Sequence, residues 1–141
     1  METQDKFAAP ILGFVSLAQV KKLPDKSRIA VIGIVRAVGG LKKFSSKEGR
    51  AIEKREFALV DDSNTKVFCT LWGQVARDFE AAKIGRVYAL LAVSISDYSG
   101  SRSLNLNGGA SILPHPAISR SDDLNTWYTT VQPDHAFAVL P

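Results

Sequence analysis

Hydrophobic residues in the middle of the chain fall into short runs with the period or composition of β-strands. Five strands are predicted, over residues 28–38, 53–60, 65–72, 86–96 and 103–113. The first is rich in Val and Ile, and Gly33 within it predicts a bend or bulge. The third alternates most clearly, with Val67, Cys69 and Leu71 on one face and Trp72 on the other.

Helical patterns occur at three places. Apolar residues recur at helical spacing over 74–82, so a helix separates the third and fourth strands, and Gly85 follows it. A terminal helix is predicted over 119–128, with Ser121 as its N-cap. A short helix over 16–23 precedes the first strand.

The order of these elements favours an all-β fold, the five-stranded Greek-key OB-fold barrel with a helix between strands 3 and 4 and a C-terminal helix. An SH3-like barrel or a small sandwich shares much of the pattern, but the helix favours the OB-fold. The domain is predicted over 14–128, after a flexible arm at 1–13. Residues 129–141 hold two prolines and no clear period. They form either a linker or a tail that packs on the domain.

Composition narrows the class of protein. The 141 residues make one domain, and 18 basic against 14 acidic side chains give a net charge of +4, which favours polyanionic partners. The single cysteine, Cys69, forms no internal disulfide and no zinc site, so we expect a reducing compartment, the cytosol or nucleus. No run approaches the ~18 apolar residues of a membrane span. The first dozen residues lack the layout of a signal peptide.

One segment concentrates positive charge. Its cations are Lys42, Lys43, Lys47, Arg50, Lys54 and Arg55. In the predicted barrel this segment is the loop between the first and second strands together with the start of the second strand. It forms one wall of the OB-fold groove, where cations would follow a phosphate backbone. The alternative is a solvated, charged loop.

Two aromatic residues suit base stacking. Trp72 ends the third strand on the face opposite the apolar run, and Tyr98 lies in the predicted turn at 97–101. A flat ring beside a cationic groove stacks on nucleotide bases. Alternatively, Trp72 packs under the following helix and Tyr98 is an ordinary loop residue. The other large aromatics are assigned to core or helix packing: Phe57, Phe68, Phe79, Tyr88 and Trp127.

No residue pattern specific to an enzyme is present. His115 and His135 have no Ser or Cys partner at a recognisable spacing. The adjacent acids at 61–62 and 122–123 are interpreted as turn and helix-cap residues, because neighbours in a strand or turn point apart. Neither a metal site nor a cofactor is expected.

Several ordered segments resemble a known family. They contain Lys54-Arg55-Glu56-Phe57, Thr70-Leu71-Trp72-Gly73, Ser96-Asp97-Tyr98, Arg102-Ser103-Leu104 and Asp123-Leu124-Asn125-Thr126-Trp127-Tyr128. In this order they resemble the second single-stranded-DNA-binding domain of the large subunit of eukaryotic replication protein A. The likeness runs from about Phe14 to Tyr128.

The resemblance implies an OB-fold that holds single-stranded DNA, largely independently of sequence, between two stacking aromatics. These correspond to Trp72 and to Tyr98, where the family commonly has phenylalanine. The family's backbone-contacting cations match Arg50 and Lys54, with Lys43 and Lys47 nearby.

The chain departs from the family on the fourth strand. Some members carry an arginine shortly before the Ser-Asp pair, where this chain has Val93-Ser94-Ile95. Arg102, after a loop that is one residue longer, is the candidate replacement for that phosphate contact.

The resemblance also implies a nuclear protein of DNA replication, repair and recombination, with further OB domains and subunits of a replication protein A-like complex as partners. Two other classes stay open. A single-strand nuclease, as in a meiotic paralogue, would use Glu48, Glu53 and Glu56 to hold metal. A protein-interaction module would receive a peptide in the groove. Telomere-binding paralogues share the same pattern.

Overall fold

The computed structural model describes residues 14–80, 83–98, 101–106 and 109–139. Its elements are α1 (Leu17–Val20), β1 (Arg28–Val38), β2 (Lys42–Ser45), β3 (Ala51–Asp61), β4 (Thr65–Trp72), α2 (Gly73–Asp78), β5 (Val87–Tyr98), β6 (Ser101–Leu106), β7 (Ser111–Pro114), α3 (Ser119–Tyr128) and β8 (Ala138–Val139). None of the helices in these ranges is long and apolar enough to cross a membrane.

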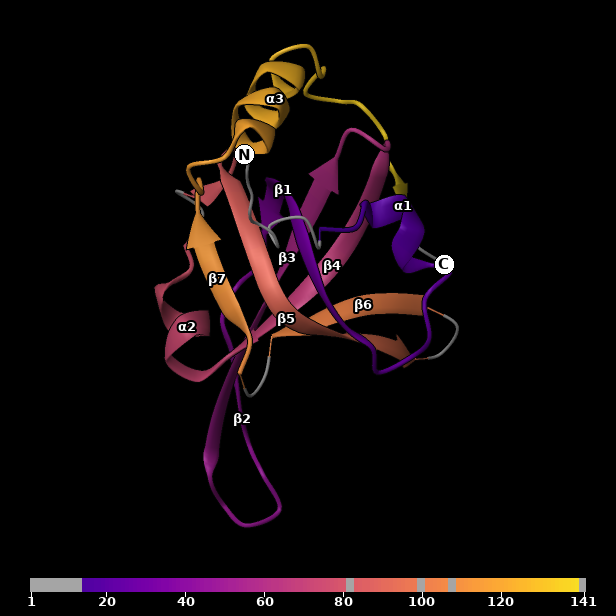
Figure 1. The fold of residues 1–141 in the computed structure, drawn as a ribbon. Coiled ribbons are helices and arrows are strands. Elements are labelled where there is room, and N and C mark those ends of the chain that lie inside the picture. The colour runs from indigo at the N-terminus through magenta and orange to yellow at the C-terminus, as the bar shows by residue number, and fades with distance from the viewer. Residues whose placement is uncertain (1–13, 81–82, 99–100, 107–108, 140–141) are drawn as a thin grey trace.

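Five of the strands close into a barrel. β1 pairs antiparallel with β3 and β5, β3 with β4, and β5 with β6, and the parallel pairing of β4 with β6 completes the ring. α2 lies between the third and fourth barrel strands, and α3 lies at one end of the barrel (Figure 1). The predicted OB-fold barrel, with its inserted helix and its C-terminal helix, is confirmed.

The remaining strands differ from the prediction. β2 pairs with β3 and extends a hairpin where the sequence predicted a loop. The predicted strand at 103–113 is two strands, because β6 and β7 pair with different parts of β5: Leu104 lies opposite Ile95, whereas Ile112 lies opposite Leu90. Gly109, between the two strands, has a φ of +77°, a left-handed conformation that favours glycine.

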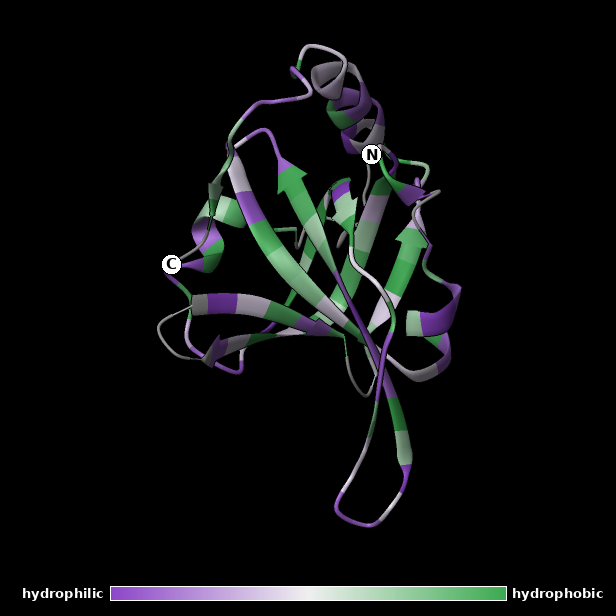
Figure 2. Cartoon of the chain, turned by 180° about the vertical axis from the view of Figure 1, so that it is seen from behind, coloured by the Kyte–Doolittle hydropathy of each residue, from purple (hydrophilic) through white to green (hydrophobic). Residues whose placement is uncertain are grey.

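Alternate residues of the barrel strands fill its interior. Leu59, Val67 and Leu71 are fully buried there, as is the thiol of Cys69, whose pKa is raised by burial. A second cluster lies on the outside of the barrel, where Leu124 of α3 packs with residues of β1, β3 and β5. Figure 2 shows the corresponding apolar bands along the barrel strands and the hydrophilic end of the β2–β3 hairpin.

Gly33 is required by close packing and not by a bulge. The pairing of β1 with β5 is regular at Gly33, and the irregularities of β1 lie between Ile29 and Val31 and between Val35 and Ala37. A Cβ added to Gly33 would lie 2.6 Å from the carbonyl oxygen of Val60. The absence of a side chain therefore lets β1 and β3 approach each other, and the predicted bulge at this residue is wrong.

The helices also depart in detail from their predicted bounds. α1 has four residues and is capped by Ser16, whose hydroxyl accepts from the N–H of Gln19. α2 ends before Phe79, which has an extended backbone and is 4% exposed. α3 begins at Ser119, so Ser121 is not its N-cap; the Ser121 hydroxyl donates to the carbonyl oxygen of Pro116 at 2.6 Å.

The segment after α3 packs on the barrel. The guanidinium of Arg36 donates to the carbonyl oxygens of Gln132 (3.2 Å), Pro133 (2.9 Å) and His135 (3.3 Å). Phe137 is 7% exposed within the outer cluster, and β8 then pairs with the start of β4. Through these contacts, residues between 131 and 139 lie against the barrel.

Candidate nucleic-acid interface

Trp72 lies on the outward face of the barrel. In β4, Val67, Cys69 and Leu71 are fully buried, while Trp72 is partly exposed and belongs to neither apolar cluster. This alternation agrees with the face predicted for Trp72. Its ring is therefore not sealed inside the barrel and does not serve as core.

Two side chains hold the Trp72 ring in place. The indole N–H donates to Oδ1 of Asn105 on β6 at 2.7 Å. Lys54, the cross-strand partner of Trp72 on β3, places its Nζ 5.7 Å from the ring centroid. A cation at this distance is attracted to the negative face of the ring. An aromatic platform and a positive charge are thus adjacent on one sheet face.

The same face continues along β3 and β4 through their register. Glu56 pairs with Thr70, and Ala58 pairs with Phe68. Phe68 is 42% exposed, so its assignment to core or helix packing is wrong. The corresponding assignments of Phe57, Phe79 and Tyr88 are confirmed by their places in the barrel interior, and Trp127, on α3, packs against the outer cluster.

The β2–β3 hairpin carries the basic segment beyond the barrel (Figure 1). Lys47 and Arg50 are exposed in its turn, which is closed by a hydrogen bond from the Ser46 N–H to the Arg50 carbonyl oxygen at 2.8 Å. Gly49 adopts a φ of +80° there. Lys47 and Arg50 therefore project into solvent from the end of the β2–β3 hairpin. The same hairpin carries Lys54, which lies beside Trp72.

Hairpin register separates two of the lysines. Lys42 lies opposite Lys54 and so shares the Trp72 face, whereas Lys43 lies opposite Glu53 on the other face, with its Nζ 3.9 Å from that carboxylate. The sequence predicted a phosphate contact for Lys43, whereas Lys42 was predicted only as one cation of the basic segment.

Phe44 was also missed. It lies opposite Ile52, on the same face as Lys42, and is 45% exposed. Once the hairpin register is known, the alternation of side chains along β2 and β3 places both Lys42 and Phe44 on the face of Lys54.

Arg102 is held by α1 and its following turn. Its Nη1 donates to the carbonyl oxygen of Val20 at 2.8 Å and to that of Leu23, and its Nη2 lies 3.8 Å from an Asp97 carboxylate oxygen. The side chain is only 16% exposed. Because these partners occupy the guanidinium, the geometry does not support the predicted phosphate contact, and Arg102 is not retained in the site.

Tyr98 can be placed only by its backbone. It is the last residue of β5 and pairs with Ser101 of β6, so the predicted turn at 97–101 is shorter than expected and Tyr98 lies in a strand. Its side chain lies outside the described part of the structure.

The acidic residues of the nuclease alternative lie apart. Glu53 forms an ion pair with Arg77 of α2, on the face away from Trp72. Glu56 is exposed on the Trp72 face, and Glu48 lies in the hairpin turn. Within the described residues, no three His, Cys, Asp or Glu side chains are grouped so that they could hold a metal ion.

The closed barrel, the inserted helix and the aromatic, cationic face of β3 and β4 define an OB-fold domain with a candidate nucleic-acid interface. The chain belongs to the replication protein A OB-domain family, whose family model matches residues 17–114.

Relatives agree with this assignment. Replication factor A protein 1 of Saccharomyces cerevisiae is 29% identical over 115 residues, covering 82% of this chain and 18% of the yeast protein. The probable replication factor A 73 kDa subunit of Caenorhabditis briggsae is 33% identical over 129 residues, covering 89% of this chain and 20% of that protein. The chain thus spans about a fifth of the length of these relatives.

Solved structures show the same fold. A chain of a replication protein A heterotrimer bound to single-stranded DNA superposes with a TM-score of 0.80 at 30% identity, covering 90% of this chain and 30% of that one. Fission yeast Pot1, solved with single-stranded DNA, gives 0.60 at 13% identity over 96% of this chain and 44% of its own, a likeness of fold alone.

Proposed function

We propose that the outward face of β3 and β4 binds single-stranded DNA without catalysis. The observation that carries the proposal is the geometry of Trp72, a partly exposed ring held by Asn105 and flanked by Lys54. Membership of the replication protein A OB-domain family supports it, as does the likeness to a chain of the DNA-bound heterotrimer.

In this proposal a base stacks on Trp72. The sugar-phosphate backbone then passes Lys54, beside the ring, and continues toward the β2–β3 hairpin. Stacking on one ring contributes about 1–3 kcal/mol and is tolerant of sequence, because every base has a π-face. The proposed phosphate contacts are Lys54, Lys47 and Arg50, with Lys42 on the same face. Lys43 contributes from the far side of the hairpin, as a longer-range charge beside Glu53.

We further propose Tyr98 as a second stacking residue. It ends β5 at the edge where β5 and β6 meet, and β6 also supplies Asn105 to Trp72. Asn105 lies opposite Ser94, and Tyr98 lies four residues further along β5, so a DNA strand that leaves Trp72 would run diagonally over β6 to reach Tyr98. Trp72 and Tyr98 would then stack different bases.

The names of the relatives support a wider setting in DNA replication. We propose a nuclear role in DNA replication, repair and recombination, with further OB domains and other subunits of a replication protein A-like complex as partners. One domain offers a short binding face, so tandem domains would raise affinity through effective concentration.

A titration of the chain with a fluorescent thymine oligomer, and with duplex DNA of equal length, tests the proposal. We expect binding of the single strand, with a log–log salt slope of about −0.7 for each phosphate contacted, and weaker binding of the duplex. Equal affinity for duplex, or no binding of either, would contradict it.

A further inference from the structure

A second pairing of a lysine with an exposed ring lies on the β3–β4 face. Lys66 places its Nζ 5.5 Å from the centroid of the Phe68 ring, and this arrangement resembles that of Lys54 over Trp72 at 5.7 Å. Both rings come from β4 and, being four residues apart, share one face of the strand.

The neighbours of Phe68 leave its ring open. Its cross-strand partner on β3 is Ala58, and its partner on β6 is Ser103. Both side chains are small, so the ring is 42% exposed although it lies in the middle of a strand paired on both sides. Burial in the core or in the outer cluster does not account for it, since Phe68 belongs to neither.

We propose that Phe68 is an additional base-stacking platform, which extends the DNA-binding face along β4 beyond Trp72. The proposal rests on the single-strand binding proposed above. Four residues of β-strand separate the two rings by about 13 Å, so they serve different bases. Lys66 supplies a positive charge at this end of the path, as Lys54 does beside Trp72.

The β3–β4 face disfavours a general apolar docking role for Phe68. Between the two rings lie Thr70 and its partner Glu56, and Asn105 flanks Thr70 on β6. The rings are therefore isolated apolar surfaces separated by polar groups, and this spacing suits single stacked bases better than a continuous apolar partner.

The dependence of affinity on oligomer length distinguishes an additional stacking platform from a general contribution of Phe68 to binding. The experiment is an anisotropy titration of the chain with labelled thymine oligomers of increasing length, using Phe68→Ala, Phe68→Trp and Trp72→Ala. Leu113→Ala is the matched control, because Leu113 is also 42% exposed but lies on β7, which pairs with β5.

We expect Phe68→Ala to leave the dissociation constant of the shortest bound oligomer unchanged and to weaken binding of longer ones about fivefold or more. Phe68→Trp should keep the gain in affinity with length, and Leu113→Ala should match the parent. Thermal unfolding of each variant checks that the barrel is intact, and Phe68→Leu replaces Phe68→Ala if the latter is unstable.

Two results would overturn the inference: equal affinity of Phe68→Ala and the parent at every length, or equal weakening at every length. If Trp72→Ala also binds like the parent, then the proposed function itself is wrong. If Trp72→Ala lowers the affinity for the oligomers and Phe68→Ala does not, only the proposed extension of the binding face along β4 is overturned.

Discussion

The indole N–H of Trp72 donates to Oδ1 of Asn105 at 2.7 Å, which ties the last residue of β4 to β6. This hydrogen bond joins two barrel strands that are already paired in parallel, so the amide is held by the sheet and orients the ring. Trp72 is therefore ordered before any ligand arrives, and less conformational entropy is lost on binding.

Replacing Asn105 by Ala should weaken single-strand binding by about 0.5–1.5 kcal/mol, because the Trp72 ring loses the hydrogen bond that orients it. An anisotropy titration with a thymine oligomer measures the change. Asn125→Ala, on α3, is the control and should bind like the parent. Unaltered affinity of Asn105→Ala would show that the hydrogen bond does not prepare the ring for binding.

Replacing Lys54 by Met removes the charge over Trp72 and keeps most of the aliphatic stem. We expect lower affinity and a salt slope that is smaller in magnitude by about 0.7, the contribution of one phosphate. Titrations at three salt concentrations give the slope. The control Arg86→Met, at the residue just before β5, should leave the salt slope near the parent value. A parent-like slope for Lys54→Met would contradict the proposed phosphate contact.

Replacing Arg36 by Met should destabilise the fold by about 1–3 kcal/mol, because the segment after α3 loses a charged donor shared by three of its carbonyl groups. Urea unfolding measures the loss, with Lys83→Met as control. Amide exchange at Ala138, whose N–H donates to the Asn64 carbonyl oxygen, should accelerate in Arg36→Met. Unchanged exchange there would mean that Arg36 does not hold the tail.

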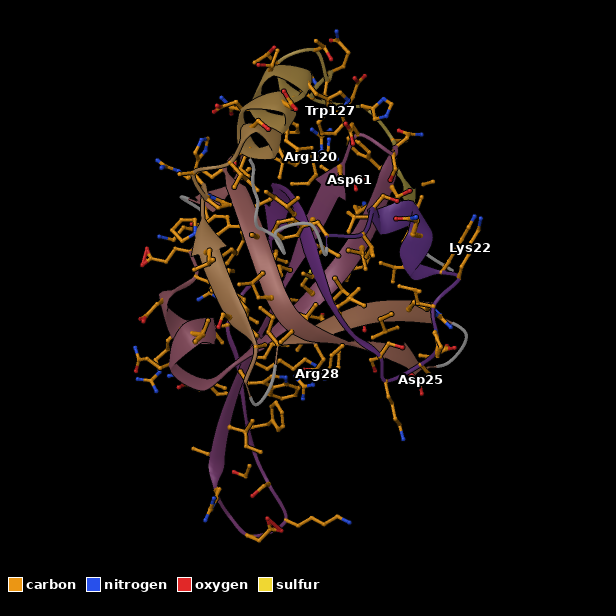
Figure 3. The ribbon with its side chains drawn as sticks, viewed as in Figure 1. Lys22, Asp25, Arg28, Asp61, Arg120 and Trp127 are labelled. Atoms are coloured by element: carbon orange, nitrogen blue, oxygen red, sulfur yellow. The ribbon has the colours of Figure 1, made fainter. Side chains whose placement is uncertain are left out.

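The ion pair of Asp62 and Arg120 should make stability depend on pH. Arg120, on α3 close to Asp61 at the end of β3 (Figure 3), donates to both Asp62 carboxylate oxygens at 2.6 and 2.8 Å. The hydrogen bonds from Arg120 lower the pKa of Asp62. Because the folded pKa is below the unfolded value, the stabilisation is present above about pH 4 and is lost as the pH falls through the folded pKa.

Both side chains are more than a third exposed, so the pair contributes at most about 1 kcal/mol. Asp62→Asn should therefore be less stable than the parent at pH 7 by that amount or less, and the difference should shrink below about pH 4. Urea unfolding at pH 7 and pH 3 measures it, with Asp134→Asn as control. A difference that persists undiminished at pH 3 would exclude ionisation as its cause.

Local patterns account for what the sequence predicted. The period of two in residues 65–72 is a property of the strand itself, so it placed Trp72 outside the core without knowledge of its neighbours. The inserted helix was recognised in the same way, from the change of period after Gly73.

For the residues whose environment was predicted wrongly, that environment is set by partners that are distant in the sequence. Phe68 is exposed because its neighbours on two other strands are small. Arg102 is held by the carbonyl groups of Val20 and Leu23, far away in the chain. The choice between Lys42 and Lys43 depends on the register of a hairpin whose turn was not predicted. None of these relationships can be obtained from hydrophobic period alone.

Substitution of Trp72 by Ala tests the central claim most directly. The variant should remain folded, because Trp72 lies outside both apolar clusters, and it should bind a thymine oligomer about 1–3 kcal/mol more weakly than the parent. Trp127→Phe, within the outer cluster, serves as the matched control and should retain affinity. Parent-like binding by a folded Trp72→Ala variant would contradict the account.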